Sequence, residues 1–307
     1  MTAIQALPIE HLLVPLDGSH LAEAPLPAAI ALAGRLGARV TLLHVMERDA
    51  PEKVHGERHL TGATEAESYL QSVAARFAEA GVPVEGHVHP NQEGDVAASV
   101  AVHALALGAD LILLCTHGRG GPREWVSGSL AQQVVRRAVA PVLLIRPGVG
   151  GQAPPFAPGA VLVALDGTDE GELALPAALA IARAVGAPLR LIVVVATLGT
   201  IADDRAAAAR LAPAATAAAL DLEQDAAGRY LQRLRERLPA GDVPVEVEVR
   251  RGDAVRVVMD LAARAEGSVL AMATHGRASF GALWSGSIGS RLVARATNPL
   301  LLVRAAG

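Results

Sequence analysis

Lysine is almost absent from this chain, and its scarcity limits how the chain can bind phosphate. Lys53 is the only lysine among 307 residues. The chain therefore has no G-x-x-x-x-G-K-[ST] phosphate loop, because that loop uses its lysine to reach the phosphates. It also lacks the strand-end lysine of a phosphotransfer receiver domain and the usual residue for Schiff-base chemistry. Any phosphate must be held by backbone N–H groups, hydroxyls or arginine.

Cysteine, excess charge and long apolar runs are also missing. One cysteine cannot form an intramolecular disulfide, and it fits a reducing compartment. A net charge of −4 creates no global field toward nucleic acid or acidic membranes. Residues 1–17 lack the basic and apolar segments of a signal peptide. No apolar run approaches the ~20 residues of a spanning helix. We expect a cytoplasmic protein without nucleic-acid or membrane partners.

Short apolar runs alternate with Ala- and Leu-rich segments, and this alternation predicts the fold class. The runs lie at 11–17, 40–45, 84–88, 111–115 and 141–146. The segments between them have helical periodicity and end at glycines such as Gly37 and Gly81. Alternating strands and helices predict an α/β fold with a parallel sheet and right-handed crossovers.

The pattern then starts again, which indicates a tandem duplication. A stretch rich in proline and glycine ends near residue 160, and Asp166 then follows an apolar run as Asp17 does. An Ala-rich insertion at roughly 203–238 distinguishes the second copy. A repeat this long is a duplicated domain rather than a solenoid. We expect domain 1 at 1–148, a linker at 149–160 and domain 2 at 161–307.

One motif occurs in both copies after the fourth strand. Residues 115–118 (CTHG) are followed by nine residues and Gly128-Ser129, and residues 273–276 (ATHG) by nine residues and Gly286-Ser287. Each Gly-Ser pair precedes an amphipathic helix. The free N–H groups and the dipole at a helix start favour an anion such as phosphate. The motif thus predicts a repeated anion site.

Three kinds of strand-end residue should meet in each copy. In open parallel sheets, ligands bind outside the carboxyl ends of the strands, at the switch point of the strand order. Asp17, Val45 and the motif at 115–118 all follow or end predicted strands. Their convergence predicts one crevice per copy. An alternative for Asp17 and Asp166 is a helix N-cap, a common place for aspartate.

The histidines leave two further alternatives open. His117 and His275 are shared by the copies and are either general acid–base groups or residues that fix the loop by a backbone hydrogen bond. The chain also has closely spaced histidines at 55 and 59 and at 87 and 89. Metal ligation requires a third ligand, which the sequence does not identify. We expect neither a dedicated metal site nor a catalytic residue.

These residues resemble the universal stress protein family, over nearly the whole chain and as two tandem domains. The family's nucleotide-binding members carry G-x2-G-x9-G-[ST], to which both motif copies correspond except at the first glycine. The chain also has Val-Pro-Leu-Asp-Gly-Ser at 14–19, Leu-His-Val at 43–45 and Pro-Val-Leu-Leu-Ile-Arg at 141–146. The resemblance implies two open five-stranded parallel sheets, order 3-2-1-4-5, flanked by helices. This architecture is adenine nucleotide alpha hydrolase-like or flavodoxin-like.

The resemblance also implies a set of nucleotide contacts. An acid lies near the adenosine, the backbone of a valine meets the adenine, and the motif cradles the phosphates with the next two residues as helix N–H donors. The implied cofactor-binding residues are Pro15, Asp17, Val45, Cys115, Gly118, Gly128, Ser129, Leu130, Ala131, Ala164, Asp166, Val194, Ala273, Gly276, Gly286, Ser287, Ile288 and Gly289.

The first motif glycine is missing in both copies. Cys115 and Ala273 stand in its place, and each adds a Cβ toward the ribose and phosphate. The resemblance implies a stress-response regulator that binds ATP, with Mg2+ as a companion ion. A scaffold that has lost the ligand and a slow ATPase are the alternatives. It also implies pairing of the fifth strands, 142–146 and 300–304, as a pseudo-dimer within the chain, and a homodimer.

Overall fold

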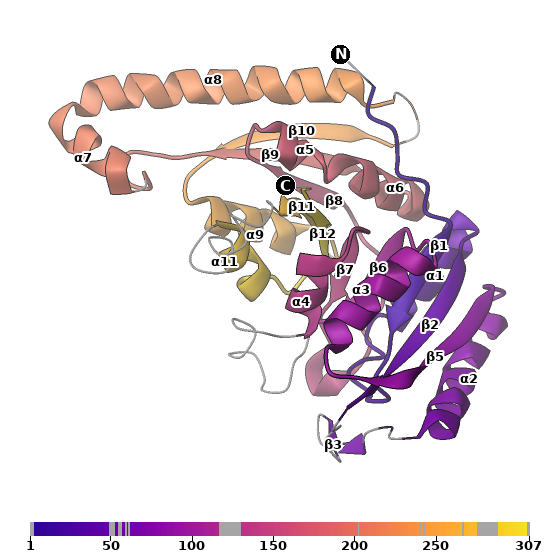
Figure 1. Ribbon diagram of the computed structural model, residues 1–307. Helices are drawn as coiled ribbons and strands as arrows, with labels where there is room; N and C mark the ends of the chain where they lie inside the picture. Colours follow the sequence, from indigo (N-terminus) through magenta and orange to yellow (C-terminus); the bar gives the residue numbers. More distant parts are fainter. Residues whose placement is uncertain are drawn as a thin grey trace. The chain divides into compact units, whose positions relative to one another are not determined.

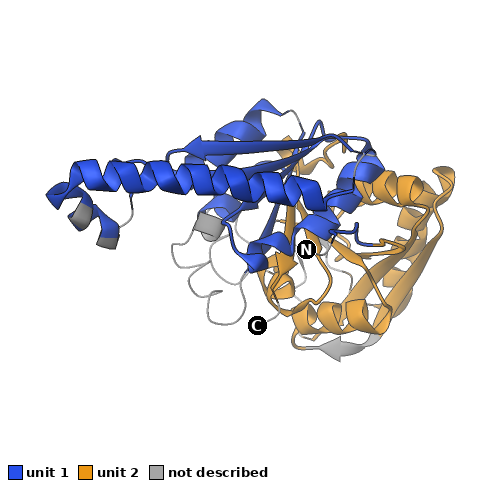
Figure 2. Cartoon of the chain, turned by 90° about the horizontal axis from the view of Figure 1, so that it is seen from above, with its two compact units in different colours: residues 1–7, 158–298, 307 blue, residues 8–157, 299–306 orange. Residues whose placement is uncertain are grey.

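The chain folds into two compact units of mostly parallel strands flanked by helices (Figures 1 and 2). The computed structural model describes residues 3–48, 53–54, 57–58, 60, 62–116, 130–201, 203–239, 241, 243–265, 267–274 and 288–305. Unit 1 contains residues 1–7, 158–298 and 307, and unit 2 contains residues 8–157 and 299–306. None of the described helices is long and apolar enough to span a bilayer.

Unit 2 contains the strands of the first sequence copy and one strand of the second. Its strands are β1 (His11–Pro15), β2 (Arg39–Glu47), β5 (Val84–Glu93), β6 (Leu111–Cys115), β7 (Val142–Ile145) and β12 (Leu300–Arg304). The sheet order is β12-β7-β6-β1-β2-β5, so the first copy has the expected order 3-2-1-4-5. Only β12 runs antiparallel to its neighbour in this unit's described sheet, with Leu301 opposite Leu143.

The remaining elements of unit 2 connect these strands. They are α1 (Leu26–Leu36), β3 (Lys53–Val54), β4 (Glu57–Arg58), α2 (Ala63–Glu79), α3 (Val96–Ala106), α4 (Leu130–Arg137) and the 3-10 helix η2 (Val149–Gly151). Strands β3 and β4 pair with each other as a small antiparallel sheet after β2. Strand β5 extends five residues beyond the expected end at 88.

Unit 1 repeats this architecture with the second sequence copy. Its strands are β8 (Val161–Leu165), β9 (Leu189–Val195), β10 (Val245–Arg251) and β11 (Val269–Thr274), in the parallel order β10-β9-β8-β11. Its helices are α5 (Asp169–Glu172), α6 (Leu175–Val185), α7 (Asp203–Leu211), α8 (Pro213–Arg237), α9 (Ala254–Arg264) and α11 (Ile288–Arg295). The Ala-rich insertion forms α7 and much of α8, which are separated at Pro213 because proline is tolerated only in a first helical turn (Figure 1).

Local sequence signals explain where several helices begin and end. Gly37 and Gly186 end α1 and α6 in the left-handed conformation, with φ of 68° and 66°, which glycine adopts without a steric penalty. Asp95 and Asp253 cap α3 and α9, and each side chain accepts a backbone N–H three residues on. Helix α1 begins at Leu26 rather than at residue 23, because residues 20–25 form a turn before it.

Both chain ends belong to the unit formed mainly by the other sequence copy. Strand β12 pairs with β7 in unit 2, which confirms the expected pairing of the fifth strands. The N-terminal arm, residues 3–7, belongs to unit 1. The Ile4 N–H donates to the carbonyl of Arg237 at 2.9 Å, and the Leu7 N–H donates to that of Pro176 at the same distance. The Arg237 carbonyl is one of the last four in α8, and these carbonyls have no N–H donor within the helix. The Ile4 N–H of the arm supplies the missing donor.

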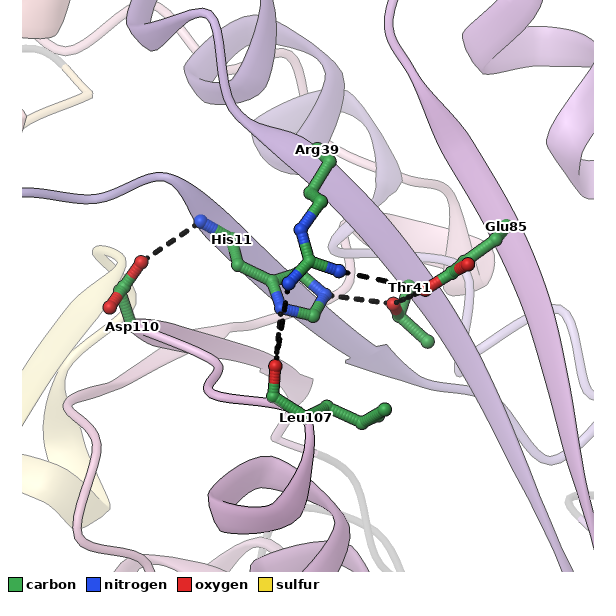
Figure 3. A network of polar contacts seen from close by, with 6 residues as sticks. All are labelled: His11, Arg39, Thr41, Glu85, Leu107 and Asp110. Atoms are coloured by element: carbon green, nitrogen blue, oxygen red, sulfur yellow. Dashed lines mark hydrogen bonds and ion pairs between the residues drawn. The ribbon is translucent and has the colours of Figure 1, made fainter.

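A buried polar network joins the amino ends of the strands in unit 2 (Figure 3). His11 Nδ1 donates to the Leu107 carbonyl at 3.1 Å, and Nε2 lies 2.8 Å from the Thr41 hydroxyl. The Thr41 hydroxyl lies 2.9 Å from Glu85, and the Asp110 carboxylate accepts the His11 N–H at 3.0 Å. This end of the sheet is opposite the strand ends where a ligand is expected. The network therefore fixes strand positions.

Candidate functional site

The expected site residues of the first copy gather at the carboxyl ends of three neighbouring strands. Strand β1 lies between β2 and β6, and all three run parallel. Pro15 ends β1, Val45 lies near the end of β2, and Cys115 ends β6. Asp17 follows β1 by two residues, so its half-buried side chain belongs to the same edge. The strand order thus brings together the residues that are expected to contact the adenosine.

Asp17 holds the turn after β1 and caps no helix. Its Oδ1 accepts the Ser19 N–H at 2.8 Å, whereas the N-cap of α1 is Pro25. Gly18 has a φ of +88°, and a Cβ there would come within 2.5 Å of Leu60, so the turn requires glycine. The helix-cap alternative for Asp17 is therefore wrong.

Asp166 makes the same turn at the end of β8. Its Oδ1 accepts the Thr168 N–H at 3.0 Å and the Thr168 hydroxyl at 2.7 Å. Thr168, not Asp166, caps α5. Gly167 has a φ of +85°, close to that of Gly18. The two acids thus share one backbone geometry, although Asp166 is exposed where Asp17 is half-buried.

The other described residues of the second copy also lie at strand ends. Ala164 is in β8, Val194 in β9 and Ala273 in β11, and β8 pairs with both other strands. Cys115 and Ala273 are both half-buried, so each Cβ stands at the edge where the family has glycine. Thr116, next to Cys115, is buried, and its hydroxyl has no hydrogen-bond partner among the described residues.

The phosphate side of each site lies largely outside the described residues. This applies to His117, His275 and the motif residues Gly118, Gly128, Ser129, Gly276, Gly286 and Ser287. The helix that follows the motif is described in both copies. Leu130 and Ala131 begin α4, and Ile288 and Gly289 begin α11. The expected helix after each Gly-Ser pair is therefore present.

His44 is a site residue whose role the sequence did not reveal. Its ring is buried in β2, and Nδ1 donates to the Leu16 carbonyl at 2.8 Å. Leu16 directly precedes Asp17, and its N–H donates to Leu43 at 2.8 Å. His44 therefore fixes the backbone from which the acid projects. The Leu-His-Val stretch at 43–45 is the only sequence signal for His44, because its hydrogen-bond partner, Leu16, is distant in the chain.

A second feature that the sequence analysis missed is an ion-pair cluster beside Asp17. The Tyr69 hydroxyl donates to Glu23 Oε1 at 3.1 Å, and Arg76 donates to Glu23 Oε2 at 2.8 Å. Burial raises the pKa of Tyr69, and so do the Glu23 and Asp17 carboxylates. The hydroxyl therefore stays protonated and can donate to Glu23. Tyr69 and Arg76 belong to α2, whereas Asp17 and Glu23 belong to the loop between β1 and α1.

The same residue types form a cluster in unit 1. Arg237 donates to Glu172 Oε2 at 2.7 Å, with both side chains at least three-quarters buried. Burial raises the pKa of Tyr230, as do the nearby Glu172 and Asp166 carboxylates. Unlike that of Tyr69, the Tyr230 hydroxyl is buried beside its glutamate, Glu172, without a well-formed hydrogen bond to any described residue. The second cluster is thus a looser copy of the first.

The fold brings a third histidine to the pair on β5. The His103 ring in α3 lies 5.2 Å from that of His87 and 4.7 Å from that of His89, between ring centroids. The His103 Nδ1 donates to the Ser99 carbonyl at 2.8 Å. Within the described part of the chain, however, no three His, Cys, Asp or Glu side chains are placed to hold a metal ion.

Comparison with known proteins identifies the family of the chain. The model of the universal stress protein family matches residues 8–146 and again residues 159–304. The chain belongs to the universal stress protein family. The two matches follow the two sequence copies, so the chain is a tandem member.

Known relatives agree with this assignment. Over 148 residues the chain is 30% identical to universal stress protein YxiE of Bacillus subtilis (strain 168), a match covering 44% of this chain and 97% of the relative. A universal stress protein from Archaeoglobus fulgidus DSM 4304 has a TM-score of 0.64 and 17% identity, over 96% of each chain. The functionally unknown protein PA1789 from Pseudomonas aeruginosa PAO1 has a TM-score of 0.65 and 16% identity, over 96% of this chain and 92% of that one. The two structures share the fold.

Proposed function

We propose that the chain is a cytoplasmic stress-response regulator that binds ATP, with Mg2+ as a companion ion. The supporting observation is the duplicated acid turn, in which Asp17 and Asp166 each follow a central strand with the same hydrogen bond to the residue two positions on. A stability role alone does not require the same glycine-containing turn after the first strand of both copies, at the strand ends where a ligand is expected. The aspartate would bind the ribose side, and the backbone at Val45 or Val194 the adenine.

The phosphates would bind through the Gly-Ser pairs before α4 and α11. The single lysine lies elsewhere, in β3, so backbone N–H groups, hydroxyls and arginine are the available donors, and the Gly-Ser pairs supply the first two. The buried Thr116 hydroxyl, which has no hydrogen-bond partner among the described residues, adds a polar group directly after β6. Each domain would hold its own site, with domain 1 at 1–148 and domain 2 at 161–307.

A scaffold that acts by protein contacts alone is the second candidate function, and Cys115 and Ala273 favour it. The Cβ of each residue takes up space beside the ribose and phosphate that the glycine of nucleotide-binding family members leaves open. Calorimetric titration of the full chain with ATP and adenosine, with and without Mg2+, separates the two candidates. The regulator binds ATP more tightly than adenosine, whereas the scaffold binds neither.

Catalysis and assembly are tested on the same protein. A slow ATPase would release ADP from bound ATP over hours, whereas a regulator without hydrolytic activity would retain intact ATP. We also propose a homodimer, and light scattering with and without ATP measures the mass. A monomeric mass under both conditions contradicts the dimer and leaves the nucleotide proposal unaffected.

A further inference from the structure

The chain has two tyrosines, and both occupy the same position in the two copies. Tyr69 lies in α2 and Tyr230 in α8, each in the helix that precedes the third strand of its copy. An arginine follows each tyrosine by seven residues, two turns along the same helix face, as Arg76 and Arg237. Aromatic residues make up only 2% of the chain, so this duplicated placement is specific.

In unit 2 the tyrosine and the arginine occupy both oxygens of one carboxylate. Glu23 accepts from Tyr69 at 3.1 Å and from Arg76 at 2.8 Å, and its side chain is 16% exposed. A partly buried carboxylate with an ionic partner forms stronger hydrogen bonds than an exposed neutral pair. Glu23 is therefore tied firmly to α2.

Glu23 lies in the loop that carries Asp17. Hydrogen bonds within the loop are local, such as those from the Ala22 N–H to the Ser19 carbonyl at 3.1 Å and to the Ser19 hydroxyl at 3.2 Å, and Leu60 packs against Gly18 from outside the loop. Leu16 and His44 fix the start of the loop, and Glu23 fixes its far end. Between these two anchors lies Asp17, whose Oδ1 accepts the Ser19 N–H at 2.8 Å.

We propose that Tyr69 and Arg76 are positioning residues that act through Glu23 and hold the acid loop, residues 17–25, in its ligand-binding form. The effect on nucleotide affinity rests on the proposed function, whereas the effect on the loop does not. Tyr69 acts on the acid loop through Glu23, and the acid of that loop is expected to contact the part of the ligand that ATP and adenosine share. Its loss therefore lowers affinity for ATP and adenosine by the same factor.

The second copy provides a matched control within the same chain. The Tyr230 hydroxyl lies beside Glu172 without a well-formed hydrogen bond to a described residue, and Glu172 is held by Arg237. Removing a hydroxyl with a weak contact costs less than removing one with a full hydrogen bond. Tyr230→Phe should therefore raise exchange in residues 166–176 less than Tyr69→Phe raises it in residues 17–25. Arg205→Ala is a second control, because it breaks a 2.5 Å ion pair with Glu223 between α7 and α8, away from the acid loops.

The experiment combines amide hydrogen exchange with calorimetry on the full chain. Parent, Tyr69→Phe, Arg76→Gln, Tyr230→Phe and Arg205→Ala proteins are compared without ligand and are then titrated with ATP and adenosine. In Tyr69→Phe, exchange in residues 17–25 should rise about three- to tenfold, the range for one lost hydrogen bond. Affinity for both ligands at the first site should fall by a similar factor. Arg76→Gln should act in the same direction, Arg205→Ala should match the parent, and Tyr230→Phe should have a smaller effect on its own loop than Tyr69→Phe has on residues 17–25.

Three results would overturn the proposal. Exchange in residues 17–25 that is unchanged in both Tyr69→Phe and Arg76→Gln shows that the cluster does not hold the loop. Exchange that rises evenly through unit 2 shows a stabilising role only, and a local rise with unchanged affinity shows that the loop does not limit binding. If the parent binds neither ligand, the proposed function fails, and exchange alone then decides whether the cluster fixes the loop.

Discussion

Leu301 of β12 lies directly opposite Leu143 of β7 in an antiparallel ladder, and both side chains are completely buried. The last strand of the chain therefore completes the sheet that the first copy began. An uncovered β7 would leave an apolar edge with unpaired backbone groups, which favours aggregation. Arg304 adds to the contact by donating to the carbonyls of Arg136 and Arg137 at 3.0 and 3.2 Å.

We therefore expect Leu301→Ala to destabilise unit 2. Truncating a fully buried leucine typically costs about 2–5 kcal/mol, through lost burial and the cavity that remains. Leu222→Ala in α8 is the matched control, because Leu222 is 68% exposed. Its effect should stay within about 0.5 kcal/mol. Urea denaturation of both variants measures the difference, and equal stabilities would contradict the buried pairing.

Ser129→Ala should weaken ATP binding at the first site roughly tenfold. The hydroxyl would donate a hydrogen bond to a charged phosphate, worth about 1.5–3 kcal/mol, and about 1.4 kcal/mol corresponds to tenfold in affinity. Gly128→Val should cost more, because its side chain occupies the space of the phosphate. Calorimetry with adenosine is the control, since adenosine has no phosphate and should be far less sensitive. Equal losses for both ligands would mean that the phosphates are not held here.

Restoring glycine at the first motif position should tighten nucleotide binding in both copies. Cys115 ends β6, and its side chain is larger than that of Ala273 in β11, so steric hindrance is greater in the first copy. The gain should therefore be larger for Cys115→Gly than for Ala273→Gly. Calorimetric titration with ATP measures both gains. If neither variant binds ATP more tightly than the parent, the side chains do not obstruct the ligand.

Unit 2 should lose stability as the pH falls below about 6.5, the ordinary pKa of histidine. Burial lowers the pKa of His11, and the positive charge of Arg39 lowers it further. The Leu107 carbonyl and the nearby carboxylates raise this pKa, but the net shift is downward. A lowered pKa means that the unfolded chain takes up the proton first. The contribution of His11 to stability is therefore complete at pH values above the pKa of the unfolded state. It declines as the pH falls from there toward the lower pKa of the folded state.

The pH effect can be assigned by substitution. Burial also lowers the pKa of His87, as do His103 and His89, so this cluster contributes in the same direction. His11→Gln and His87→Gln remove one titrating group each. Each should reduce the difference in unfolding free energy between pH 7.5 and pH 5.5. A parent protein that is equally stable at both pH values would contradict the lowered pKa values of His11 and His87.

The sequence by itself determined the fold class, the duplication and the ends of several helices. These features depend on local patterns, such as the apolar runs that become β1 and β8, the glycine at 37 that ends α1, and the aspartates at 95 and 253 that cap α3 and α9. The acids at the strand ends were predictable for the same reason, because each follows the apolar run of its own strand.

Only the tertiary structure decided which distant residues support those acids. Asp17 was proposed both as a ligand contact and as a helix cap, and the Ser19 hydrogen bond excludes the cap. His44, Tyr69 and Glu23 act through partners far along the chain, and no local period encodes such contacts. The antiparallel register of β12 is likewise set by packing against β7, because a strand's own sequence fixes its apolar residues but not its neighbour.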